Sequence, residues 1–290
     1  MPETLTPEEI QRHIETVNKS KEPGRILASA TALARSGNRD AILALTNPLR
    51  RKESLDRLDP PKGEDQGITN ITRIFRALAL NPSEATARVC VLVYNSEEFR
   101  ELPVRINLLL GALAAVRPVN EEAAVIFRSS SAEGFAEVNA PLLLKNESPL
   151  ALQVFEEIIT GTWVESYVKV DILHRSVLPV RTQMLIVEMC SGLLAGELAP
   201  DVRGAIIETL FDYQSRLWFG PAMYPPKPQP WESASTEVLQ FMISLANRVL
   251  GGEIEARLSG PVQSTRTHLG IILQSRQPLG GMGQVSGLPT

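Results

Sequence analysis

The chain has 290 residues and a formal net charge of −4, with 43% hydrophobic and 21% charged residues. This composition supplies enough apolar side chains for a sizeable folded core and excludes a largely disordered chain. Residues 145–220 hold ten Asp and Glu against six Lys and Arg, and this acidic balance argues against a nucleic-acid partner.

Apolar residues recur at helical spacing along most of the chain, which predicts an all-α fold. Prolines stand at or just before the start of many of these patterns, where the missing amide proton costs nothing. Residues 89–94 and 167–172 are also candidate strands, but we interpret both as helix because neither has a hairpin partner nearby. The predicted helices span residues 7–19, 23–35, 38–58 with a break at Pro48, 68–80, 83–94, 101–116, 120–130, 132–144, 149–160, 163–175, 179–195, 201–219 and 234–250.

Segments without helical periodicity divide the chain. Residues 59–67 have the Pro, Gly and charge content of a loop, and residues 220–231 have the proline content of an extended connection. Residues 252–290 carry few periodic apolar positions and many Gly, Ser, Gln and Pro. We therefore predict one helical domain at 1–251 and a flexible or partner-bound tail at 252–290.

A short phrase recurs where helices are expected to begin: Pro103-Val104-Arg105, Pro179-Val180-Arg181 and Asp201-Val202-Arg203. Each is followed by an apolar helical stripe. Together with Leu198-Ala199-Pro200 before the third phrase, the pattern resembles HEAT repeats, with armadillo repeats as near relatives, over roughly residues 70–250. The interval from Val104 to Val180 suits two such repeats, whereas that from Val180 to Val202 is too short for one.

The resemblance implies an α-solenoid of stacked helix pairs with an extended binding surface. It also implies that Arg105, Arg181 and Arg203 are structural residues that bridge to acidic groups of neighbouring repeats. A ladder of cations for phosphate groups is the alternative for these arginines.

No arrangement of residues predicts chemistry. His174 follows Asp171 by three residues, but we favour an ordinary helix-end hydrogen bond because no nucleophile has a recognisable spacing. Cys90 and Cys190 lie in apolar stretches and are interpreted as buried side chains rather than disulfide partners or zinc ligands. The sequence thus yields no catalytic, cofactor-binding or metal-ligating residue, and we expect no cofactor.

Two groups of apolar residues are candidates for partner binding. The aromatic residues around the proline-rich connection either contact a partner or fix that connection to its own domain, which we rank first. An apolar stretch near residue 270 requires a covering surface, supplied by this chain, a second copy or another protein. The candidate partner-binding residues are Trp218, Phe219, Tyr224, Trp231, Leu269, Ile271 and Ile272.

Met1-Pro2-Glu3 begins a polar segment without the features of a secretion signal, and no apolar run is long enough to span a bilayer. We expect no membrane insertion and a cytoplasmic location. The predicted function is a non-enzymatic scaffold or adaptor that binds another protein, with self-association left open. The alternatives, listed because HEAT-like proteins include them, are a nucleic-acid-binding protein and a cofactor-handling lyase or chaperone.

Overall fold

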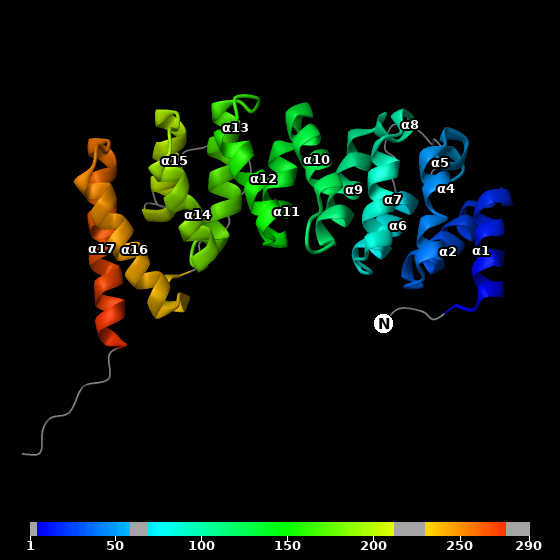
Figure 1. Cartoon of the computed structure of the whole chain (residues 1–290), viewed down its shortest axis with the longest axis horizontal. Helices are drawn as coiled ribbons and strands as arrows, with labels where there is room; N and C mark the ends of the chain where they lie inside the picture. Colours follow the sequence, from blue (N-terminus) through cyan, green and yellow to red (C-terminus); the bar gives the residue numbers. More distant parts are fainter. Residues whose placement is uncertain (1–4, 59–68, 212–229, 277–290) are drawn as a thin grey trace, which may run out of the picture. The chain divides into compact units, whose positions relative to one another are not determined.

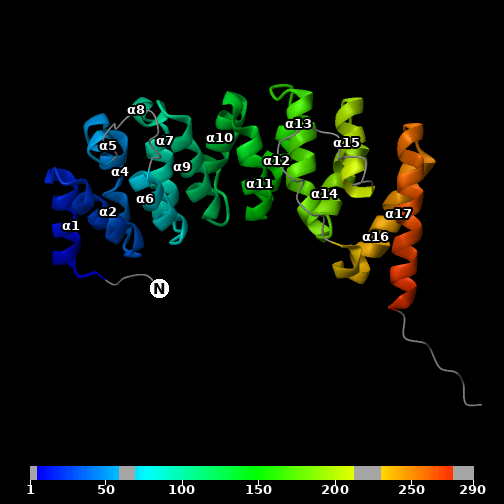
Figure 2. The same ribbon diagram turned by 180° about the vertical axis from the view of Figure 1, so that it is seen from behind.

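The computed structural model describes residues 5–58, 69–211 and 230–276, and these are predominantly helical, without a strand among them. Figures 1 and 2 show the helices from two opposite sides. The chain divides into two compact units, Met1–Val164 (unit 1) and Glu165–Thr290 (unit 2). The sequence predicted one helical domain over residues 1–251 and did not indicate this division near residue 165.

The first two helices of unit 1 have the bounds that the sequence predicted, because strong capping signals mark where they begin. Thr6 and Glu9 form a capping box at the first helix, and Pro7 and Pro23 occupy first helical positions. The elements are α1 (Pro7–Lys19), α2 (Pro23–Arg35), α3 (Arg39–Leu43), α4 (Thr46–Arg50), α5 (Lys52–Leu58), α6 (Thr69–Ala79), α7 (Glu84–Tyr94), α8 (Glu97–Arg100), α9 (Pro103–Ala115), α10 (Glu121–Ser130), the π-helical turn η1 (Ser131–Phe135), α11 (Ala136–Asn146) and α12 (Pro149–Thr160).

The helices of unit 1 pack as two rows. In the first, which we call the α6 row, α2 packs against α6, α6 against α9, and α9 against α11. In the second, the α7 row, α3 and α4 pack against α7, α7 against α10, and α10 against α12. The rows also pack on each other, as α7 does on α9, and the labels in Figures 1 and 2 allow both rows to be followed.

Apolar side chains between the rows form the core of unit 1. The rings of Phe75 and Phe99 lie 5.6 Å apart, and Phe127 and Phe155 are fully buried. Burial of each such ring contributes about 1.5–3 kcal/mol. The amphipathic pattern that predicted the helices therefore corresponds to this shared interior.

Unit 2 contains two irregular turns at the phrase Pro179-Val180-Arg181 and a helix that the sequence did not predict. Its elements are α13 (Ser166–Ile172), the π-helical turn η2 (Leu173–Val177), the 3₁₀ turn η3 (Leu178–Val180), α14 (Met184–Ala195), α15 (Pro200–Phe211), the 3₁₀ turn η5 (Trp231–Ser233), α16 (Thr236–Gly251) and α17 (Ala256–Ser275). The helical interpretation of residues 167–172 and 89–94 is confirmed by α13 and α7.

Helix α17 corrects the prediction of a flexible tail over its described part. It packs against α16 and α15, and Leu258, Val262 and Leu269 are buried. Its end is fixed by Arg276, whose guanidinium donates to the carbonyls of Ala234 and Glu232 at 2.6 Å each. Residues 277–290 lie outside the described residues.

Among the helices described, none combines the length and the apolar content that crossing a membrane requires.

Candidate functional site

A groove in unit 1 is the strongest candidate for a binding site. It encloses about 510 Å³ and lies where α8, the start of α9 and the turn η1 meet. Apolar and charged side chains both face it. The lining residues are Glu97, Arg100, Glu101, Pro103, Ile106, Glu133 and Phe135.

The π-helical turn η1 gives the groove one of its walls. Gly134 within it has φ +100°, a left-handed conformation that glycine adopts without the penalty of a Cβ. This turn separates α10 from α11 and carries Glu133 and Phe135 to the groove. Single π-helical turns of this kind occur frequently at functional sites. The sequence predicted helices on both sides of residue 131 but not the turn between them.

Glu133 is held by two partners from the opposite wall. The Tyr94 hydroxyl donates to Oε2 at 3.2 Å, and Arg100 Nη2 donates to Oε1 at 2.8 Å. The Arg100 guanidinium also lies over the Tyr94 ring, 5.1 Å from its centroid. Burial, reinforced by the Glu133 charge, raises the pKa of Tyr94 to about 12, so this phenol remains a neutral donor at physiological pH.

Two exposed apolar residues are sequence neighbours of Pro103, a lining residue of the groove. Leu102 and Val104, just before and within the first turn of α9, are 42% and 48% exposed. Ile106, which lines the groove, is largely buried. The arrangement can accept an apolar side chain of a ligand while Glu97 and Glu101 remain at the solvent edge. Neither the groove nor any other described part of the chain gathers three or more His, Cys, Asp or Glu able to hold a metal ion.

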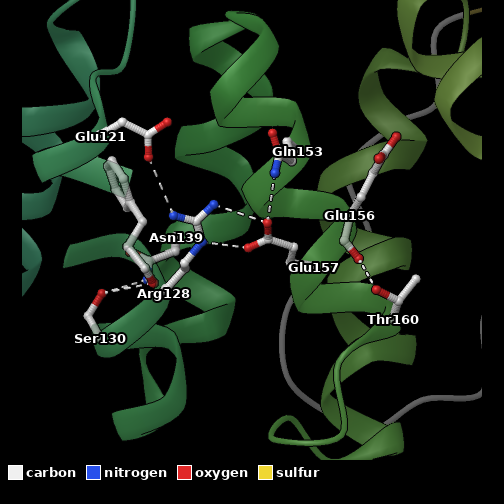
Figure 3. Close-up of polar contacts among 9 residues, drawn as sticks. Glu121, Arg128, Ser130, Asn139, Gln153, Glu156, Glu157 and Thr160 are labelled. Carbon is white, nitrogen blue, oxygen red and sulfur yellow. Dashed lines mark hydrogen bonds and ion pairs between the residues drawn. The ribbon is translucent and has the colours of Figure 1, made fainter. Parts of the chain in front are cut away.

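A second polar cluster joins α10 to α12. Figure 3 shows the Arg128 guanidinium between the carboxylates of Glu121 and Glu157. Arg128 donates to Glu157 twice, at 2.6 and 3.0 Å, and this pairing lowers the pKa of Glu157 and raises that of Arg128. Gln153 donates to the same carboxylate at 3.1 Å. Because its members satisfy one another, we interpret this cluster as a link between neighbouring helices rather than a binding site.

The arginines of the recurring phrase hold helix ends. Arg105 donates to the Glu98 carbonyl at 3.1 Å, and Arg203 donates to the Leu194 carbonyl at 2.8 Å. Both acceptors lie in the last turn of a helix, where carbonyls lack intrahelical partners and cations are favoured. Arg105 is buried. The sequence had suggested acidic partners, and it did not predict these backbone acceptors.

Arg181 has a related position in unit 2. It is 5% exposed and lies within reach of the Thr209 and Leu210 carbonyls, at 3.5 and 3.4 Å. Its guanidinium also stacks on Trp231, 4.7 Å from the ring centroid. Trp231 therefore fixes its segment to unit 2, which is the interpretation that the sequence ranked first.

The other predicted partner-binding residues have different locations. Leu269 and Ile272 are buried within unit 2, so α17 directs them into its own unit and not toward a partner. Ile271, by contrast, is 60% exposed. Trp218, Phe219 and Tyr224 lie outside the described residues.

His174 lies beside a carboxylate that local spacing did not indicate. Its Nε2 is 3.7 Å from Oε2 of Glu208 on α15, and Glu208 also forms an ion pair with Arg257 of α17. Asp171, the neighbour considered from the sequence, instead pairs with Arg175 at 2.8 Å. Together these contacts connect η2, α15 and α17, which is consistent with a structural role.

Both cysteines are buried, as the sequence predicted. Desolvation raises the pKa of the Cys90 thiol to about 12, which disfavours the reactive thiolate.

Comparison with known proteins provides no further assignment, since no family model, curated protein or solved structure matches the chain.

Proposed function

We propose that this chain is a HEAT-like α-solenoid that acts as a scaffold or adaptor, binding another protein through its helical surface and performing no chemistry of its own. The observation that carries the proposal is the groove at the start of α9, where Pro103, Ile106 and Phe135 line it among charged side chains and Leu102 and Val104, the sequence neighbours of Pro103, are exposed. Exposed apolar side chains beside a concave, partly polar wall are typical of protein-binding surfaces.

Repeated contacts in unit 1 support the solenoid part of the proposal. Asn81, after α6, donates to the Ala34 carbonyl in the last turn of α2 at 3.1 Å. Asn146, at the end of α11, donates to the Ala114 carbonyl in the last turn of α9 at 2.7 Å. In both pairs an asparagine at the end of one helix satisfies a carbonyl at the end of its neighbour in the α6 row. Such recurring neighbour contacts are expected of an array of similar units.

The test is reconstitution with a purified partner. Proteins bound to the full chain in its native host are identified by crosslinking, expressed, and titrated against the wild type and two variants. Val104→Asp places a charge next to Pro103, a lining residue of the groove, while the control Val125→Asp alters a residue that is 56% exposed on α10. We expect Val104→Asp to weaken binding about tenfold or more, as loss of a central apolar contact does, and the control to stay within about twofold.

Two results would contradict the proposal. One is equal affinity of both variants and the wild type for every purified partner, which would remove the groove from the binding surface. The other is turnover of a small molecule by the purified chain that Val104→Asp leaves unchanged, which would show that the chain has chemistry of its own.

A further inference from the structure

Charge is distributed unevenly between the two rows of unit 1. Helices α2, α6 and α9 contain no Asp or Glu, although each contains at least one arginine. The α7 row carries the acidic residues instead, with Glu84 on α7 and Glu121 and Glu122 on α10. Three neighbouring helices of a chain with a net negative charge thus carry only positive side-chain charge, whereas α11, the fourth helix of the α6 row, contains Glu137.

The centre of this basic region is the outer face of α6. Arg73, Arg76 and Leu80 follow one another at steps of three and four residues, so they share one side of the helix. All three are exposed, Leu80 by 79%, whereas Ile74 and Leu78 on the opposite side are buried. Within the described residues, neither Arg73 nor Arg76 forms an ion pair or a side-chain hydrogen bond.

The neighbouring helices α2 and α9 contain no negatively charged residue. On α2 the exposed positions include Gly24 and Ala28, and on α9 they include Asn107. Gly111 of α9 has open space where a Cβ would stand. We call the surface formed by Arg73, Arg76 and Leu80 the α6 face.

We infer that the α6 face docks an acidic segment of a partner protein that also presents an apolar side chain to Leu80. This inference rests on the proposed function, since the partner is a protein. The unpaired guanidinium groups would attract carboxylates, and the exposed leucine would be covered by an apolar contact. A nucleic-acid backbone fits less well, because it offers phosphates at every step but nothing apolar for Leu80, and the face has few cations.

The experiment uses the full chain and a fluorescein-labelled peptide composed of glutamate and leucine as the probe. Polyglutamate and a single-stranded DNA oligonucleotide, each matched to the peptide in charge, are titrated in parallel by fluorescence anisotropy. Charge reversal by Arg73→Glu with Arg76→Glu is compared with Arg50→Glu and Arg51→Glu, which reverses two exposed arginines at the end of α4. Circular dichroism confirms that both double variants remain folded.

We expect the wild type to bind the peptide more tightly than polyglutamate or DNA, and more weakly as salt is raised. The reversal on α6 should weaken peptide binding about tenfold or more, while the reversal on α4 changes it less than about twofold. Leu80→Ser should weaken binding of the peptide but not that of polyglutamate.

Tighter binding of the DNA, or equal losses from the two double variants, would overturn the inference. With the reconstituted partner, normal binding by the α6 double variant but not by Val104→Asp would also overturn it, while the proposed function would stand. Loss of partner binding in the α6 variant alone would support the inference and remove the groove from the proposal.

Discussion

Asn146 allows a direct test of how neighbouring helices of the α6 row are held together. Its amide nitrogen donates to the Ala114 carbonyl at 2.7 Å and to the Val116 carbonyl at 2.9 Å. The carbonyl of Ala114 has no helical partner, because the residue four positions later is Pro118, which lacks an amide proton. The side chain of Asn146 is 3% exposed, so water cannot readily replace it.

The expected loss follows from these two acceptors. Replacement by Leu keeps the volume similar but leaves one buried and one partly buried carbonyl without a donor. An unsatisfied buried polar group costs about 1–3 kcal/mol, and less where water has some access, so we expect Asn146→Leu to lower the free energy of unfolding by about 2–4 kcal/mol. Urea denaturation followed by circular dichroism measures this difference.

Asn146→Asp adds a test of the direction in which stability changes with pH. An ionised carboxylate has no proton to donate and would face two carbonyl oxygens, so its folded-state pKa is expected to lie above its unfolded value. The variant should therefore be closest to the wild type below about pH 4 and lose stability as the pH rises through the folded-state pKa. Asn107, exposed on α9, provides the matched controls Asn107→Leu and Asn107→Asp. Unfolding free energies of Asn146→Leu within about 0.5 kcal/mol of the wild type would refute this reasoning.

Two further predictions concern α12 and α17. Because pairing lowers the native pKa of Glu157, Glu157→Gln should cost about 0.5–1 kcal/mol at pH 7, a modest value for a side chain 35% exposed. This difference in unfolding free energy should vanish as the pH falls from the pKa of Glu157 in the unfolded chain through its lower pKa in the native state. A difference that stays constant with pH in urea titrations would contradict pairing as the cause. Leu269→Ala should lower the free energy of unfolding by about 2–5 kcal/mol because Leu269 is fully buried, whereas the exposed control Ile271→Ala should lower it by under about 0.5 kcal/mol. Equal melting temperatures of the two variants would indicate that α17 is a tail that does not contribute to the fold.

The helices could be predicted where local signals agree with packing. The predicted bounds of α1, α2 and α12 match the structure because proline at a first position defines each start. The boundary near Val164 could not be predicted, since it reflects which helices pack together and leaves no mark of composition in the sequence.

The groove could be predicted only in part. An apolar stripe was predicted after Pro103-Val104-Arg105, and Ile106 is buried, but the pattern gave no reason for Val104 to remain exposed, which depends on what packs nearby. Glu133 meets Tyr94 across 39 residues of sequence, and that contact requires the turn at Gly134. The only sign of the positive φ of Gly134 in the sequence was a glycine near the start of the predicted helix 132–144.

Helix α17 shows why the tail was misinterpreted. Gly260, Pro261 and Gly270 are poor residues for a helix interior, and Pro261 removes one intrahelical hydrogen bond. Its buried positions Leu258 and Val262 lie on one helix face, but such sparse positions do not stabilise an isolated helix in water. Contacts with α15 and α16 supply the missing stabilisation, and these partners are invisible to any reading of residues 252–290 alone. A segment with weak propensity can thus be helical when neighbours bury its few apolar residues, which is the property that Leu269→Ala measures.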